Sequence, residues 1–226
     1  MFWHELIQLV KKSGELLSFC FKTVFSKENP TEDKLAALSL SDWKNISSPQ
    51  VLSCGTITIF PYENKTVKDA IIAIKNTRNR SIGQSMSLIA CDFLLEELAE
   101  QKLTRNFSDP LLVPIPTSKI RKRKRGFNPS LFVSEMISEM LPSTPVLKDV
   151  LVKTKETRPQ KQLSRNERLS NVENSMTVKE SLKEKIIGRD IIVIDDVATT
   201  GATLLEAKRS LLLAGARHVL TFALAH

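Results

Sequence analysis

The fold of this chain is decided by the stretch Ile191-Ile192-Val193-Ile194-Asp195-Asp196-Val197-Ala198-Thr199-Thr200-Gly201-Ala202-Thr203. Its first four residues are apolar and β-branched, which is typical of a strand buried on both faces. A polar turn follows, and a helical pattern then runs from about Thr203 to Ala214, with Gly215 placed to end the helix. A buried strand that leads into a helix predicts the carboxyl edge of a parallel sheet, where ligands bind in open α/β folds.

The turn combines acidic, small and hydroxyl-bearing residues. Gly201 permits a tight turn, and its small neighbours leave room for successive main-chain N–H groups to point inward, as in an anion cradle at a helix N-terminus. Because Asp195 and Asp196 would repel a phosphate, we expect them to accept hydrogen bonds from sugar hydroxyls, which favours a ribose 5-phosphate ligand. The predicted phosphate loop comprises Ala198, Thr199, Thr200, Gly201, Ala202 and Thr203.

Other nucleotide-binding loops fit this sequence less well. A P-loop requires GxxxxGK[ST] and a dinucleotide fold requires GxGxxG, and neither pattern occurs in the chain. An ordinary polar turn is the remaining alternative. Two adjacent carboxylates at the end of a buried strand are costly without partners, so we favour a ligand site.

The rest of the chain alternates strand-like and helix-like segments, which predicts an α/β fold with a central parallel sheet flanked by helices. Asn128 is expected to cap one helix, with Pro129 at its first position. The expected strands cover residues 56–60, 111–115, 150–152, 191–194 and 218–225, and the other expected helices start near residues 67, 82 and 203.

Residues 1–50 are expected to form an N-terminal helical appendage to a main domain of residues 51–226. Residues 2–25 carry apolar side chains at helical spacing, which favours a helix packed on the protein's own core, with a membrane-surface helix as the alternative. Residues 26–50 are polar and turn-rich, which is typical of a boundary.

Composition narrows the setting in which the protein acts. No apolar stretch reaches the ~18 residues of a membrane span, and the N-terminus lacks the pattern of a signal peptide. We therefore expect a cytoplasmic protein. Its three widely spaced cysteines, Cys20, Cys54 and Cys91, favour buried, reduced thiols over a disulfide framework.

The run Val193–Thr203 resembles the signature that binds 5-phosphoribosyl 1-pyrophosphate (PRPP) in type I phosphoribosyltransferases. The resemblance implies the fold of that class. It also implies that Asp195 and Asp196, the catalytic pair, contact the ribose 2- and 3-hydroxyls while the phosphate loop holds the 5-phosphate. In this fold a variable hood builds the acceptor pocket. Residues 1–60 are the candidate hood, so the resemblance does not identify the acceptor.

Further blocks are similar to the ComF family, whose members are phosphoribosyltransferase-like proteins linked to DNA uptake. These blocks are Val113–Pro116, Arg125–Asn128 and the series Arg158, Gln160, Leu163, Arg168 and Asn171. Many ComF proteins begin with a four-cysteine zinc knuckle. Here the N-terminal region contains only Cys20, so we expect no zinc.

The family's pyrophosphate stretch, Leu-Lys-aromatic-x-Gly, corresponds here to Ile74–Arg78. Its lysine is retained as Lys75, whereas the aromatic residue and the glycine are not. The resemblance therefore assigns pyrophosphate binding to Lys75 and Asn76, and we add Arg125 from the basic segment that follows the strand at residues 111–115.

A basic excess lies between Lys119 and Arg168, in a chain of formal net charge +8. Residues 119–125 have three interpretations: a solvated loop, a pyrophosphate-binding segment, or a contact with nucleic-acid phosphates. We expect Arg125 to lie near the site and the outer charges to meet a polyanion. The candidates for nucleic-acid or acceptor contacts are Arg121, Lys122, Arg123, Arg158 and Arg168.

Two functions remain open from the sequence. The first is a phosphoribosyltransferase that displaces pyrophosphate from PRPP, with Mg²⁺ held through the ligand's oxygens and not by protein side chains. The second is a non-catalytic protein that senses PRPP, a related sugar phosphate or a nucleotide, and that binds nucleic acid, such as single-stranded DNA, or a DNA-processing partner. The sequence offers no obvious general base, because His4, His218 and His226 lie outside the recognised blocks and are expected to be structural or surface residues.

Overall fold

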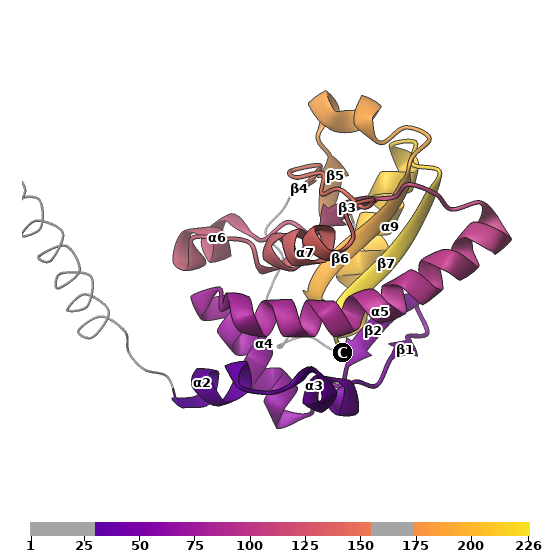
Figure 1. Cartoon of the computed structure of the whole chain (residues 1–226). Helices are drawn as coiled ribbons and strands as arrows, with labels where there is room; N and C mark the ends of the chain where they lie inside the picture. The colour runs from indigo at the N-terminus through magenta and orange to yellow at the C-terminus, as the bar shows by residue number, and fades with distance from the viewer. Residues whose placement is uncertain (1–29, 155–173) are drawn as a thin grey trace, which may run out of the picture.

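The computed structural model describes residues 30–154 and 174–226, so residues 2–25, Cys20, Arg158 and Arg168 lie outside the described part. A five-stranded sheet of order β1-β2-β7-β6-β3 forms the centre of the molecule (Figure 1). The strands are β1 (Gln50–Val51), β2 (Thr56–Phe60), β3 (Leu111–Pro114), β6 (Asp190–Val197) and β7 (His218–Ala225).

The predicted parallel sheet is confirmed for four of these strands. The short edge strand β1 differs, because the turn at Gly55, with φ at 78°, joins it to β2 as an antiparallel hairpin. In the parallel part, Pro114 is aligned with Ile194 and Asp195 is aligned with Ala223. The carboxyl ends of β3, β6 and β7 therefore meet at one edge of the sheet.

Helices cover both faces of the sheet. One face carries α4 (Lys65–Thr77), α5 (Arg80–Arg105) and α7 (Pro129–Met140), and the other carries α9 (Ala202–Leu213) and the 3-10 helix η2 (Glu180–Lys185) (Figure 1). Alternate residues of β6 point to opposite faces of the sheet. Ile192 and Ile194 belong to the core formed with α4, α5 and α7, whereas Ile191 and Val193 belong to the core formed with α9.

The segment expected to be a turn-rich boundary is instead partly helical. It contains α2 (Pro30–Ala36) and α3 (Leu40–Ile46), and α3 begins with a capping box between Ser39 and Asp42. From α3, Trp43 is fully buried and meets Phe60 of β2 edge-on, with the ring centroids 5.9 Å apart. Residues on both sides of position 50 therefore share one core.

Two further expectations need correction. The strand expected at residues 150–152 is β4 (Leu151–Lys153), which pairs with β5 (Met176–Val178) in a separate two-stranded sheet. The basic segment is helix α6 (Lys119–Arg125) and not a loop, because Ser118 caps its first turn and Gly126, with φ at 80°, ends it. None of the residues of α6 is buried.

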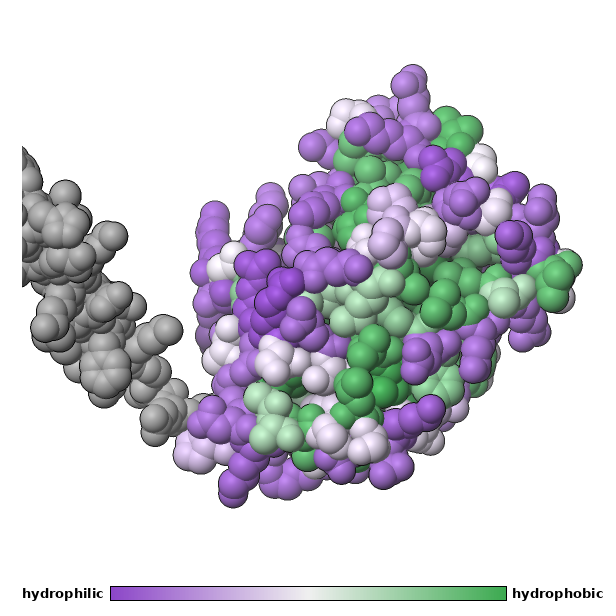
Figure 2. Space-filling model, viewed as in Figure 1, coloured by the Kyte–Doolittle hydropathy of each residue, from purple (hydrophilic) through white to green (hydrophobic). Residues whose placement is uncertain are grey.

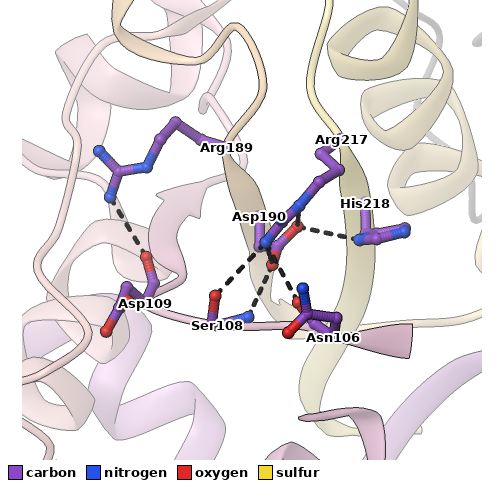
Figure 3. A network of polar contacts seen from close by, with 7 residues as sticks. All are labelled: Asn106, Ser108, Asp109, Arg189, Asp190, Arg217 and His218. Carbon is purple, nitrogen blue, oxygen red and sulfur yellow. Dashed lines mark hydrogen bonds and ion pairs between the residues drawn. The ribbon is translucent and has the colours of Figure 1, made fainter. Parts of the chain in front are cut away.

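The amino-terminal edge of the sheet is held by the buried Asp190 (Figure 3). Its carboxylate accepts hydrogen bonds from the Arg217 guanidinium and the Ser108 amide, and it lies 3.0 Å from Nδ1 of His218. Burial opposes the charged form, but these contacts outweigh it and hold the pKa of Asp190 below its ordinary value. The contact confirms a structural role for His218, at the opposite edge from the predicted site.

The two cysteines in the described part of the chain, Cys54 and Cys91, differ in burial. Cys91 is buried, as expected, and burial raises the pKa of its thiol to about 12, whereas Cys54 is only partly buried.

Within residues 30–154 and 174–226, no helix is both long enough and apolar enough to cross a membrane.

Candidate functional site

The two predicted diol-binding carboxylates, Asp195 and Asp196, lie at the end of β6 and are held from different elements. Oδ1 of Asp195 accepts hydrogen bonds from Oγ of Ser130, at 2.8 Å, and from the Asp196 amide, at 2.9 Å. Asp196 is 8% exposed, and its Oδ1 lies 2.9 Å from Nζ of Lys75. The hydrogen bonds that Asp195 accepts from described residues go to Oδ1.

The acid pair carries more negative charge than its neighbours neutralise. Burial, followed by the adjacent charge of Asp196, raises the pKa of Asp195 to about 7, although Ser130 and Lys75 act in the opposite direction. One ammonium group therefore serves two carboxylates. An arrangement of this kind favours a ligand that brings hydroxyl donors and a cation.

Lys75 and Asn76 lie in the last turn of α4, and only the lysine points to the acid pair. The structure uses its ammonium to hold Asp196, while Asn76 is exposed. Their predicted role in pyrophosphate binding stays a prediction. Ser130, which the sequence reasoning missed, lies two residues after the Arg125–Asn128 block, in the first turn of α7.

The start of α7 is fixed to the end of β3 by one side chain. The Asn128 side chain accepts a hydrogen bond from the Ser130 amide at 3.2 Å, and its Nδ2 donates to the Ile115 carbonyl at 2.9 Å. This confirms the predicted cap. It also explains why Ser130 reaches Asp195, since β3 and β6 are neighbouring strands.

The phosphate loop follows β6, as predicted, and its last two residues, Ala202 and Thr203, are the first two residues of α9. Gly201 precedes the helix with φ at 73°, and a Cβ there would lie 2.3 Å from Sγ of Cys54. Only glycine fits this position, for reasons of both backbone conformation and space. Among the residues described, the main-chain amides of Thr200 and Gly201 have no hydrogen-bond partner, which suits an anion cradle.

Two amides of the loop depart from the expected cradle. The Ala198 amide donates to the Ala225 carbonyl at 2.9 Å, which continues the β6–β7 ladder past the end of the strand. The Ala202 amide contacts Oγ1 of Thr200 at 3.4 Å. The expectation that all small residues of the loop direct their amides inward is therefore wrong for Ala198, since the sheet uses that donor.

A pocket of about 520 Å³ adjoins the phosphate loop. Thr199, Thr200 and His226 line it, together with residues 50–53 from the β1–β2 hairpin. Nδ1 of His226 lies 3.1 Å from the Ala198 carbonyl oxygen. His226 was expected to be a structural or surface residue, and no sequence motif marks it, because the sheet register brings it to the loop.

A second pocket, of about 270 Å³, lies between the end of β3 and the α6–α7 connection. Its wall includes Lys122, Phe127 and Asn128, and the Arg78 guanidinium packs over the Phe127 ring at 5.9 Å. Arg125 is partly buried, whereas Arg121, Lys122 and Arg123 are exposed on α6, where Figure 2 shows hydrophilic side chains.

The chain is similar to a known protein family and to several known proteins. The family model described as "Phosphoribosyl transferase domain" matches residues 85–225, more than half of the chain. Competence protein F of Haemophilus influenzae is 31% identical over 114 residues, which are 50% of this chain and 49% of that protein. The DNA utilization protein YhgH of Escherichia coli K12 is 30% identical over 146 residues, 65% of this chain and 61% of that protein.

Competence protein ComFC of Bacillus subtilis is 38% identical over 103 residues, which are 45% of this chain and 38% of that protein. The chain thus spans less than two thirds of the length of each of these curated relatives. The region that the family model matches, residues 85–225, contains β3, α7, β6, the phosphate loop and β7. The chain therefore belongs to the phosphoribosyl transferase domain family, and it has the type I phosphoribosyltransferase fold.

Proposed function

We propose that the chain binds PRPP at the carboxyl edge of the sheet, with the ribose between the acid pair and the phosphate loop. The observation that carries this proposal is the acid pair itself: two adjacent carboxylates share one lysine, directly before a turn whose Thr200 and Gly201 amides lack partners among the described residues. Hydroxyl donors suit the carboxylates, and a phosphate suits the amides.

Different residues bind the ribose, the 5-phosphate and the pyrophosphate of PRPP in this proposal. The ribose hydroxyls donate to Asp195 and Asp196, and the 5-phosphate occupies the pocket lined by Thr199 and Thr200. The pyrophosphate extends toward the end of β3 and α6, where Lys122 and Arg125 supply positive charge. This orientation follows from the neighbouring carboxyl ends of β3 and β6.

Magnesium suits this donor set. The chemistry that favours it is the uncompensated charge of the acid pair, because hard cations prefer oxygen ligands and several ligand oxygens would share the ion. When bound with PRPP, Mg²⁺ would offset negative charge on the pyrophosphate oxygens. The chain's own part is to orient the sugar through Asp195 and Asp196 and to place cationic side chains near the leaving group.

The reaction that fits this arrangement is transfer of the phosphoribosyl group. The bond from the anomeric carbon to pyrophosphate breaks, and its electron pair leaves with the pyrophosphate. A lone pair on the acceptor, a nitrogen nucleophile, forms the new bond to the same carbon. Preorganised donors around the diol and the pyrophosphate would stabilise the separated charges.

Pyrophosphate release distinguishes transfer from sensing. We expect purified protein with PRPP, Mg²⁺ and a panel of nucleobases and amines to release pyrophosphate in the presence of one acceptor class. Thermal stabilisation by PRPP without turnover on any acceptor would favour a sensing protein. No stabilisation by PRPP, with or without Mg²⁺, would contradict the proposed site.

A second candidate function is the binding of single-stranded nucleic acid, and α6 is the observation that favours it. Seven consecutive residues contain six basic side chains, and the helix has no buried residue. We expect retention of labelled single-stranded DNA at low salt, weakened when Arg121, Lys122 and Arg123 are changed to Gln, with a shallower dependence on salt. Retention that these substitutions leave unchanged would exclude α6 as the contact.

A further inference from the structure

His226 is fixed beside the phosphate loop by its own main chain. Its amide donates to the Phe60 carbonyl at 3.0 Å, and its carbonyl accepts from the Tyr62 amide at 2.7 Å. These bonds place its ring at the end of β7, with Nδ1 lying 3.1 Å from the carbonyl oxygen of Ala198. The ring therefore contacts the first residue of the phosphate loop.

This contact determines which ring nitrogen carries the hydrogen. A carbonyl oxygen only accepts hydrogen bonds, so Nδ1 of His226 must be the donor. In the neutral ring, Nε2 then holds a lone pair and is an acceptor. Phosphate oxygens are acceptors as well, so a neutral ring offers them no hydrogen bond from Nε2. A protonated ring keeps the bond to Ala198 and gains an Nε2 donor.

Among the residues that line the pocket beside the phosphate loop, His226 is the one with an ionisable side chain. It lines the pocket of about 520 Å³ with Thr199, Thr200 and residues 50–53, none of which has an ionisable side chain. Of the residues hydrogen-bonded to it, Phe60 and Ala198 are also non-ionisable, and Tyr62 contributes only its amide. Imidazole is the side chain that commonly changes its charge between about pH 5 and pH 8.

We propose that His226 is a binding residue of the 5-phosphate site and takes up a proton when a phosphate monoester binds. The protonated ring donates from Nδ1 to the Ala198 carbonyl and from Nε2 to a phosphate oxygen, while the Thr200 and Gly201 amides donate to the other oxygens. This inference rests on the proposed function, because it assumes that the 5-phosphate occupies this pocket.

Proton uptake on binding is the quantity that tests this role. Calorimetric titration of ribose 5-phosphate, and of inorganic sulfate as an anion that does not itself titrate near neutral pH, would be repeated in two buffers of different ionisation enthalpy at about pH 7.5. We expect proton uptake in the wild type and in the control variant His218→Gln, and its loss in His226→Gln. The affinity of His226→Gln for ribose 5-phosphate should fall about tenfold at about pH 6 and less at about pH 8.

The outcomes separate this inference from the proposed function. Equal proton uptake by the wild type and His226→Gln, with ribose 5-phosphate bound by both, would overturn the role of His226 and leave the site standing. Failure of the wild type to bind ribose 5-phosphate would overturn the role of His226, and failure to bind PRPP as well would overturn the proposed function. If His226→Gln does not fold, the nitrogen NMR spectrum of the wild-type ring decides, since a neutral ring with hydrogen on Nε2 contradicts the proposal.

Discussion

The ammonium nitrogen of Lys75 lies 2.9 Å from Oδ1 of Asp196, which ties the last turn of α4 to the end of β6. The two side chains are 20% and 12% exposed, so the pair is only weakly screened by solvent. Lys75 supplies one positive charge for two neighbouring carboxylates, so the negative charge of the second, Asp195, is left for a bound ligand or cation to offset.

Removal of the lysine charge should destabilise the free protein. In Lys75→Met, Asp195 and Asp196 would face each other without a cation, which we expect to lower the free energy of unfolding by about 1–3 kcal/mol at about pH 8. The loss should be smaller at about pH 5, where Asp195 is protonated. Urea unfolding at the two pH values measures this, with Lys68→Met on an exposed position of the same helix as the control. Equal stability of Lys75→Met and wild type would contradict the account.

Asp195 should make the free protein less stable as the pH rises. Its pKa is raised to about 7 in the folded chain, against about 3.9 for an unperturbed aspartate. Between those values the folded state binds more protons than the unfolded state, so the free energy of unfolding falls as the pH rises and levels off above the folded pKa. Asp195→Asn should flatten that dependence and be the more stable protein above about pH 7.

The measurement for Asp195→Asn is the unfolding midpoint from about pH 4 to about pH 9. Asp92→Asn, an exposed position on α5, serves as the control and should keep the wild-type dependence. The same dependence of stability on pH in the wild type, Asp195→Asn and Asp92→Asn would show that the pKa of Asp195 is that of an ordinary carboxyl group.

Ser130 should act as a positioning residue for Asp195. Its Oγ donates to Oδ1 at 2.8 Å, and in Ser130→Ala the carboxylate loses that donor and its fixed orientation. We expect PRPP affinity to fall about 5- to 20-fold with little change in melting temperature. Ser134→Ala is the matched control, one turn along α7, because its hydroxyl donates to the Ser130 carbonyl and not to Asp195. Rescue by Ser130→Thr would support positioning, and equal affinity losses in both alanine variants would argue against it.

Asp190 should matter for stability and not for ligand binding. Asp190→Asn removes the buried charge and replaces one of the two acceptor oxygens that hold Arg217 and the Ser108 amide with an NH₂ group, which should lower the free energy of unfolding by about 1–3 kcal/mol near pH 7. Because its folded pKa is lowered, the stabilisation is present above the unfolded pKa and is lost as the pH falls through the folded pKa. The difference between variant and wild type should shrink in acid, while PRPP affinity stays unchanged.

The parts predicted from sequence are those whose signal lies within a few adjacent residues. The β6–loop–α9 unit and the Asn128 cap were predicted because a buried β-branched strand, a glycine turn and a helix cap each leave a local pattern. The Ala198 amide departs from that prediction because its use depends on the neighbouring strand β7, and phosphate binding by the loop stays a prediction.

The parts that escaped prediction depend on contacts between distant segments. His226 reaches the phosphate loop only through the β6–β7 register, and Ser130 reaches Asp195 only because α7 packs beside β6. The contact of Lys75 with Asp196 was not predicted either, while the role assigned to Lys75 in pyrophosphate binding stays a prediction. Trp43 shows the same limit, since its polar neighbours gave no sign that it would enter the core.

The most direct test of the central claim is a calorimetric titration of PRPP with Mg²⁺ into the wild type and into Asp195→Asn/Asp196→Asn. The substitutions keep the shape of both side chains and remove the charge that we expect to bind the sugar hydroxyls and favour the cation. The account predicts micromolar binding by the wild type and a loss of at least ~100-fold in the variant. Equal PRPP affinity in the two proteins would contradict it.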